Sequence, residues 1–164
     1  MASSTPTPTP NGATASPDPD TTTGTVTPSA RPRTAGYHLV GSGSGRCLDV
    51  SAPESPDPVR LRLWDCRDDR AASQVWTLRP DRSVQLGGRC LDVLGASTDS
   101  GAPIQLTTCN TTPAQQFTLN AEGQLVNAHS GLCVGAVDGS AANGALRERR
   151  TCPAGAKNQE WSRR

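Results

Sequence analysis

Short runs of alternating apolar and polar residues dominate the chain after its first third. Residues 61–64 read Leu-Arg-Leu-Trp, and residues 104–107 repeat the alternation as Ile-Gln-Leu-Thr. A period of two is typical of a β-strand with one buried face. Clusters of Gly, Pro, Asn and Ser at 51–58, 95–103 and 139–144 interrupt these runs and indicate turns. The pattern predicts many short strands and almost no helix.

The predicted strands belong to a unit that occurs three times. Its cysteines are alternately 19 and 24 positions apart, so each pair recurs after 43 residues. Gly-Arg-Cys-Leu-Asp-Val stands at 45–50 and at 88–93, and Gly-Leu-Cys-Val-Gly-Ala stands at 131–136. Each unit closes on Gln, one further residue and an aromatic residue. We expect units of about 37–86, 87–128 and 129–164, with four strands each and roughly twelve in all.

One such unit is too small to bury a hydrophobic core of its own. Three units that share a core around a common axis solve this problem. Leu48, Val50, Leu63 and Leu78, with their copies in the other units, are the aliphatic candidates for this core. The aromatic residues of the closing triplets are expected to be equivalent core residues rather than binding residues: Trp76, Phe117 and Trp161.

The six cysteines are expected to form disulfides within the units. If the units are alike, each must pair its own two cysteines, which predicts Cys47–Cys66, Cys90–Cys109 and Cys133–Cys152. A metal site would need ligands at short spacing, such as Cys-x-x-Cys, and a catalytic cysteine would need an odd one left over. Neither pattern is present, so no metal and no cofactor is predicted. Structural disulfides indicate an oxidising compartment.

Residues 1–36 differ in composition from the rest of the chain. They hold seven of the 14 prolines and many threonines, and their only large apolar side chains are Met1 and Val26. Such a segment is expected to be a disordered linker, either a spacer to another domain or a tail without function. It lacks the basic start and apolar run of a signal peptide. With the disulfides, this suggests a fragment of a longer secreted or membrane-anchored protein.

Charge and hydropathy exclude some partners. The formal net charge is +1, which gives no electrostatic reason to expect nucleic acid or an anionic membrane surface as a partner. No stretch approaches the ~18 apolar residues that a membrane span needs. A monomer that does not insert into membranes is expected.

Cys-Leu-Asp-Val, Leu-x-Leu-Trp-x-Cys and Gln-x-Trp, spread over three units, resemble the ricin B-type lectin family. The resemblance covers residues 37–164. It implies an all-β protein, a β-trefoil, of the kind that also serves as a carbohydrate-binding module on bacterial glycoside hydrolases. It further implies that each unit can carry a shallow sugar pocket, usually for galactose- or xylose-type sugars.

The resemblance places the best pocket in unit one, at Asp49, Arg62, Trp64, Ser73 and Gln74. An aromatic ring suits the apolar face of a pyranose, and a carboxylate with amide neighbours suits its hydroxyls. Strand alternation turns Trp64 outward, although it could instead cover the disulfide or a loop. Arg62 replaces the usual Gln and Ser73 the usual Asn. Arginine can donate to hydroxyls, or it could favour an acidic sugar.

Unit two is predicted to hold a weaker site. It keeps Asp92, Gln105 and Gln115, but Thr107 stands where unit one has its aromatic platform and Ala114 replaces the usual Asn. Without the platform a pocket loses its apolar contact with the sugar.

Unit three has lost more of the pattern and is predicted to be structural. Gly135 replaces the Asp, and Arg150 stands at the platform position within the Arg-Glu-Arg-Arg run at 147–150. That run could contact an anionic partner or form a solvated strand edge. Asn158 and Gln159 remain, and Gln159 is expected to support the fold.

These residues predict a non-catalytic carbohydrate-binding module that targets an attached or parent protein to a polysaccharide or glycan. The alternative is a β-trefoil that binds proteins or has a structural role, with degenerate sugar sites. A glycoside hydrolase needs two carboxylates across one cleft. Asp49 and Asp92 are equivalent by repeat and would lie in separate pockets, so we predict no catalysis in this chain. A catalytic domain elsewhere in a longer protein remains open.

Overall fold

The computed structural model describes residues 36–69, 71–145 and 147–164, without the side chains of residues 147–149. The linker predicted at the N-terminus lies outside the described residues. Among those described, no helix is long and apolar enough to span a lipid bilayer.

The described residues form twelve short strands and four single-turn 3-10 helices, as the alternating pattern predicts. In sequence order the strands form three groups of four, β1–β4, β5–β8 and β9–β12, so that β5 and β9 lie just before the unit boundaries expected at 86/87 and 128/129. Each 3-10 helix occupies a short segment between strands. The strands are β1 (Leu39–Gly41), β2 (Cys47–Val50), β3 (Val59–Trp64), β4 (Thr77–Leu78), β5 (Val84–Leu86), β6 (Arg89–Val93), β7 (Ile104–Thr107), β8 (Phe117–Leu119), β9 (Leu125–Asn127), β10 (Cys133–Ala136), β11 (Arg147–Arg150) and β12 (Trp161–Arg163), and the 3-10 helices are η1 (Leu94–Ala96), η2 (Pro113–Gln115), η3 (Val137–Gly139) and η4 (Lys157–Gln159).

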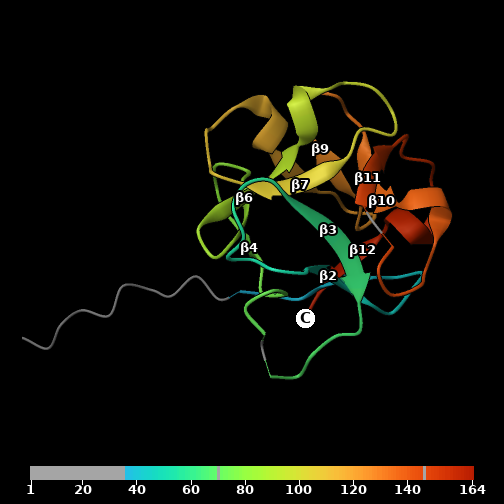
Figure 1. The fold of residues 1–164 in the computed structure, drawn as a ribbon. Helices are drawn as coiled ribbons and strands as arrows, with labels where there is room; N and C mark the ends of the chain where they lie inside the picture. Colours follow the sequence, from blue (N-terminus) through green and yellow to red (C-terminus); the bar gives the residue numbers. More distant parts are fainter. Residues whose placement is uncertain (1–35, 70, 146) are drawn as a thin grey trace, which may run out of the picture. The chain divides into compact units, whose positions relative to one another are not determined.

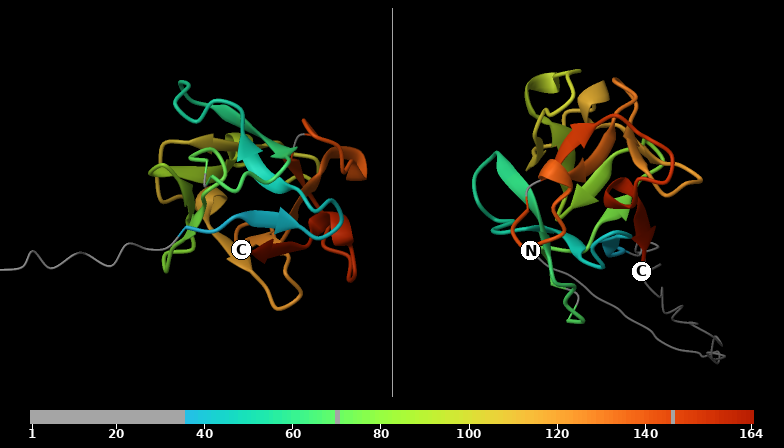
Figure 2. Two further views of the ribbon diagram at one scale, coloured as in Figure 1. Left: turned by 90° about the horizontal axis from the view of Figure 1, so that it is seen from below. Right: turned by 90° about the vertical axis from the view of Figure 1, so that its right-hand side faces the viewer.

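The strands pair in two antiparallel sheets that curl around one core (Figure 1). The larger sheet has the order β12-β1-β2-β3-β7-β6-β5-β4, and the smaller has the order β11-β10-β9-β8. The first and last strands, blue and red in Figure 2, pair with each other and close the fold. Together with the threefold repeat of four strands, this is the arrangement of a β-trefoil, as expected.

The register of the second and third strands is the same in every unit and defines equivalent positions. The first cysteine pairs with Trp64 in unit one, with Thr107 in unit two and with Arg150 in unit three. Two residues earlier along the third strand, Arg62 and Gln105 stand opposite an aspartate in units one and two. Sugar-pocket positions can therefore be compared directly between units.

The core lies where the three units meet. Leu48, Leu91 and Val134, which are equivalent by register, are all fully buried. The three aromatic residues of the closing triplets, Trp76, Phe117 and Trp161, are also buried. The two indoles use their N–H in the same way: Trp76 donates to the Leu48 carbonyl at 2.9 Å and Trp161 to the Val134 carbonyl at 3.2 Å.

Each unit is closed by its own disulfide, as the cysteine spacing predicts. The bonds join Cys47 to Cys66, Cys90 to Cys109 and Cys133 to Cys152. Their Cα–Cα distances are 5.0, 4.9 and 5.3 Å, within the ordinary range. Each bond links the start of the second strand to the residues just after the third strand, and so fixes the hairpin on which a pocket would be built.

An arginine just before the first cysteine ties two of the units to a neighbour's long loop. Arg89 of unit two donates to the carbonyls of Pro53 and Ser55 at 2.7 and 3.0 Å and pairs with Asp57, all in the unit-one loop. Unit three has Leu132 at this position.

Arg46 of unit one makes the corresponding contacts to the unit-three loop. It donates to the Ala141 carbonyl at 2.6 Å and to Asn143 Oδ1 at 2.8 Å, and it pairs with Asp65 at 3.1 Å. We call Arg46 and Arg89 the arginine clasps. They hold two of the three junctions between units.

Candidate functional site

The hairpin of β2 and β3 brings together three of the five residues predicted for unit one. Asp49 on β2 stands opposite Arg62 on β3, and Arg62 Nε donates to Asp49 Oδ2 at 2.5 Å. The guanidinium carbon of Arg62 lies 4.2 Å from the centre of the Trp64 ring. Arg62 therefore lies between a carboxylate and an indole, and both contacts are attractive for a guanidinium.

Exposure differs sharply among these three side chains. Asp49 is 1% exposed, the Arg62 side chain is 27% exposed, and Trp64 is 37% exposed. Within the part of the chain that the structure describes, Trp64 is the one exposed large apolar side chain. An exposed indole beside a partly exposed arginine and a buried carboxylate is a surface feature that suits an amphipathic ligand.

The other two residues predicted for unit one lie differently. Ser73 is half-buried, and its carbonyl accepts from the Val50 N–H at 3.2 Å, next to Asp49. Gln74 is fully buried, and both ends of its amide are committed to backbone: it accepts from the Arg67 N–H at 2.9 Å and donates to the Asp65 carbonyl at 3.0 Å. Gln74 therefore holds the loop after β3 and has no group free for a ligand.

The repeated sequence already indicates that Gln74 has a structural role. The Gln recurs in all three units, whether or not the rest of the pocket does. In unit two, Gln115 accepts from the Asn110 N–H at 2.8 Å and donates to the Thr108 carbonyl at 3.1 Å. A residue retained in a unit without a platform is better explained by the fold than by the ligand.

Unit two keeps the paired polar groups and lacks a free platform position. Gln105 Nε2 donates to Asp92 Oδ2 at 2.7 Å, and both side chains are buried. The Gln105 Oε1 atom is buried without a hydrogen-bond partner among the described residues. Thr107, at the platform position, donates to Asp57 of the unit-one loop at 2.9 Å. In unit two the position of Trp64 is thus held by a small side chain that is bonded to the neighbouring loop.

In unit three, a neighbouring side chain packs against the position at which units one and two have an aspartate. A Cβ added to Gly135 would lie 2.8 Å from Gln159 Cγ. Gln159 therefore packs against Gly135 too closely to leave room for an aspartate side chain. Gln159 Oε1 is buried and, within the described range, has no hydrogen-bond partner. The equivalent glutamines of units one and two accept from the backbone N–H after the second cysteine, and unit three has Pro153 there, which has no N–H. Sequence reasoning missed this proline.

The β11 strand carries the Arg-Glu-Arg-Arg run. It pairs with β10 and is an edge strand of the smaller sheet. Arg150 NH2 lies 3.4 Å from Asp138 Oδ1. The side chains of residues 147–149 lie outside the described residues, so the choice between an anionic partner and a solvated edge stays a prediction.

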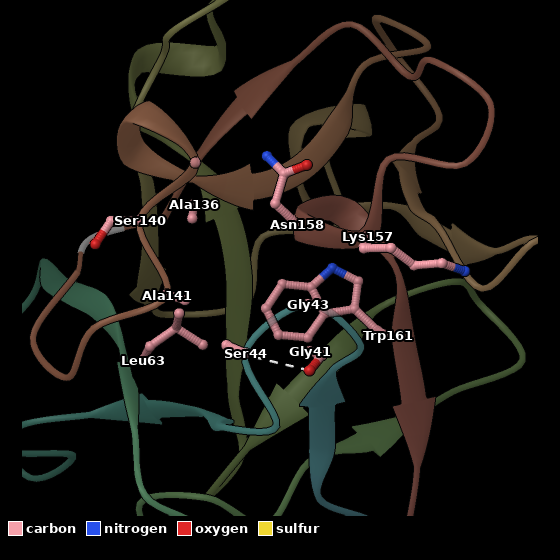
Figure 3. Close-up of a pocket in the computed structure, with 11 residues that line it drawn as sticks. Gly41, Gly43, Ser44, Leu63, Ala136, Ser140, Ala141, Lys157, Asn158 and Trp161 are labelled. Carbon is pink, nitrogen blue, oxygen red and sulfur yellow. Dashed lines mark hydrogen bonds between the residues drawn. The ribbon is translucent and has the colours of Figure 1, made fainter.

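A small hollow of about 40 Å³ lies at the junction of units one and three, and none of the five residues predicted for the unit-one pocket lines it (Figure 3). Gly41 and Ser44 line it from unit one, and Ala136 and Asn158 line it from unit three. The Trp161 indole also borders it. Ala136 is equivalent by register to Val50 and Val93, so the hollow forms where unit three has the smaller residue.

A second hollow, of about 70 Å³, lies beside the Cys90–Cys109 disulfide, and Asp81 and Ser83 are among the residues that line it. The Ser83 hydroxyl and then the Ser83 N–H donate to Asp81 and lower the pKa of its carboxyl below the ordinary value of 3.8. These bonds close a turn before β5. The sequence did not single out this position.

The chain matches the model of the ricin-type beta-trefoil lectin domain over residues 35–161. It is 39% identical over 118 residues to "Serine protease 1" of Rarobacter faecitabidus, covering 72% of this chain and 22% of that protein. It is 30% identical over 99 residues to "Beta-galactoside-specific lectin 2" of Viscum album, covering 59% of this chain and 17% of that protein. The chain thus spans less than a quarter of either relative.

Among solved structures, an exo-beta-1,3-galactanase from Clostridium thermocellum superimposes with a TM-score of 0.68 and 27% identity. The match covers 80% of this chain and 30% of the galactanase chain.

Proposed function

Because this chain belongs to the ricin-type β-trefoil lectin family, we propose that it is a carbohydrate-binding module with its working site in unit one. The observation that carries this proposal is the exposed Trp64 indole beside half-buried Arg62, which is paired with buried Asp49. An aromatic ring next to polar groups suits a pyranose, which has one apolar face and a rim of hydroxyls. The Ser73 hydroxyl, which makes no hydrogen bond among the described residues, is a further candidate contact.

A galactose- or xylose-type glycan is the proposed ligand. The similarity to a β-galactoside-specific lectin and to an exo-β-1,3-galactanase supports the galactose type. The similar serine protease and galactanase are longer chains in which the matching region is a part, which supports a role in targeting an attached protein. The three disulfides support an extracytoplasmic location.

Binding, rather than catalysis, is the activity proposed. Glycoside hydrolysis needs two carboxylates that face one sugar. Asp49 is paired with Arg62 in unit one, and Asp92 is paired with Gln105 in unit two. A single shallow site of this type is expected to bind a monosaccharide with a Kd on the order of 1 mM, about −4 kcal/mol.

The test is glycan binding by the full chain and by Trp64→Ala, measured on a glycan array and then by calorimetry with the best ligand. We expect native binding with one site per chain and at least about a tenfold loss in the variant, a difference of about 1.4 kcal/mol. Arg150→Ala changes the equivalent position of unit three and is the matched control, expected to bind within about twofold of native.

Two outcomes would contradict the proposal. Absence of glycan binding by the native chain would favour the protein-binding or structural alternative. Equal losses in Trp64→Ala and Arg150→Ala would show that binding does not depend on the unit-one site.

A further inference from the structure

Arg62 determines which polar groups the unit-one site offers to a ligand. Asp49 is 1% exposed and its Oδ2 accepts from Arg62 Nε, so its carboxylate is covered by the arginine. Only Nε of Arg62 is used in this way. Within the described residues the two terminal amino groups of Arg62 have no hydrogen-bond partner, and the side chain is 27% exposed. The site therefore presents donors and hides its acceptor.

Unit two shows how the usual amide is used at the same position. Gln105 donates from its NH2 group to Asp92, and its acceptor atom, Oε1, is buried. A glutamine amide has both a donor group and an acceptor, whereas the uncommitted groups of Arg62 are all N–H donors on a partly exposed side chain. A neutral sugar hydroxyl both donates and accepts, but a carboxylate only accepts and is matched by the guanidinium fork.

The surroundings of Arg62 also favour an anion. Arg60 lies two residues earlier on the same outward face of β3, about 6.7 Å along the strand. It is exposed and has no ion-pair partner among the residues described. The nearby acidic groups are occupied, because Asp49 pairs with Arg62 and Asp65 pairs with Arg46. The outward face of β3 therefore carries a row of Arg60, Arg62 and Trp64 with donors uncommitted.

Arg62 is also held in place before any ligand arrives. Its Nε is fixed by Asp49, and its guanidinium carbon lies 4.2 Å from the centre of the Trp64 ring. A side chain that is already ordered loses less conformational entropy when it binds. The same contact covers part of the indole face, which disfavours a neutral sugar that depends on stacking alone.

From this arrangement we infer that the unit-one site selects acidic glycans, with the carboxylate of a hexuronic acid accepting hydrogen bonds from the terminal amino groups of Arg62. The inference rests on the proposed function and names its ligand class. Arg62 is the specificity-determining residue, and Trp64 contacts the sugar ring.

The experiment is calorimetry of the full chain with oligogalacturonides and glucuronoxylan oligosaccharides, each paired with its carboxyl-reduced neutral counterpart. The expected result is binding of at least one acidic ligand about tenfold or more tighter than its neutral counterpart, with the preference weakening as salt is raised. Arg62→Gln is expected to lose the preference and to retain weak binding of the neutral oligomers. Arg67→Gln removes a nearby exposed charge and is expected to keep the preference.

Each result separates this inference from the proposed function. Equal or tighter binding of the neutral oligomers by the native chain, abolished in Trp64→Ala, would overturn the acidic preference and keep the carbohydrate site. A preference that survives in Arg62→Gln, or is lost equally in Arg67→Gln, would overturn the role of Arg62. Absence of binding to every oligomer would contradict both.

Discussion

Units one and three share a structural frame of strand pairing, a disulfide and a core tryptophan, but they differ in the side chains at the pocket positions. Both have a disulfide closing the hairpin and a buried tryptophan whose indole N–H donates to the second strand. Unit one adds the Asp49–Arg62–Trp64 cluster. Unit three has Gly135 at the aspartate position and packs Gln159 against it.

The comparison teaches that the frame and the pocket depend on different residues. The frame needs only backbone pairing, one disulfide and one aromatic side chain, and all three persist in unit three. The pocket needs outward-facing side chains at three register positions, and a change at any of them leaves the strands intact. Unit three lacks one backbone N–H at Pro153, leaves Gln159 Oε1 without a partner among the described residues and packs Gln159 against Gly135, yet the strand pairing continues.

The largest expected effect comes from removing the aromatic core residue of each unit. Trp76→Ala should lower the free energy of unfolding by about 4 kcal/mol, because it opens a large cavity at a fully buried site. Trp161→Ala should cost about 1 kcal/mol less, because Trp161 already borders a hollow and has fewer packing contacts to lose. Chemical denaturation of the oxidised proteins measures both. An equal or larger cost for Trp161→Ala would show that unit three is packed as tightly as unit one.

The next effect concerns the arginine clasps, which unit three lacks. Arg89→Leu gives unit two the residue of unit three and should cost about 2 kcal/mol, because three backbone carbonyls lose a charged donor. Arg46→Leu should cost about 1 kcal/mol, since its partner Asp65 is largely exposed and water screens the pair. Denaturant midpoints report both changes. Arg67→Leu, which removes an exposed pair, is the control and should be nearly neutral; similar losses in all three variants would refute the clasp role.

A smaller effect is expected when unit three receives the aspartate of unit one. Gly135→Asp should destabilise the fold by about 1.5 kcal/mol, because the new Cβ would lie 2.8 Å from Gln159 Cγ. It should add no second glycan site, since unit three has Arg150 in place of the indole. Thermal unfolding and binding stoichiometry are the measurements, with the exposed Ala154→Asp as control. A stable variant with two sites per chain would show that the aspartate alone limits unit three.

The smallest expected effect is a gain. Ala136→Val gives unit three the residue that stands at the equivalent positions of units one and two, and its added methyl groups would partly fill the hollow that Ala136 and Trp161 both line. The free energy of unfolding should rise by about 1 kcal/mol. Denaturant unfolding alongside Ala154→Val, which adds the same groups at an exposed position, tests this. A loss of stability would mean that the hollow is too narrow for the larger side chain.

Most of the fold could be predicted because it is encoded in repeated, local patterns. Cysteine spacing predicts the three disulfides, and alternation predicts that Leu61 and Leu63 face the core while Arg62 and Trp64 face outward, as the structure has them. The family resemblance, and not a local pattern, predicts that Asp49, Arg62 and Trp64 meet, and the register of β2 with β3 brings them together.

The rest of the site depends on contacts that no local pattern contains. Gln74 resembles a pocket residue in the sequence, and only its hydrogen bonds to the Arg67 and Asp65 backbone show that it supports a loop. The coverage of Trp64 by Arg62 depends on the rotamers of both residues. The contact between Asp57 and Thr107 joins residues of different units, and sequence reasoning within one unit could not find it.

The pairing of the first and last strands has a consequence for any protein in which this module is embedded. The His38 N–H donates to the Arg164 carbonyl at 2.8 Å, and the Arg164 N–H donates to the His38 carbonyl at 3.1 Å. Entry and exit of the chain therefore lie side by side, so the module can be inserted into a surface loop of a host protein without separating the two ends of that loop. A host domain fused at either end would be attached to the same side of the module. The rest of the module's surface would then stay clear for a glycan.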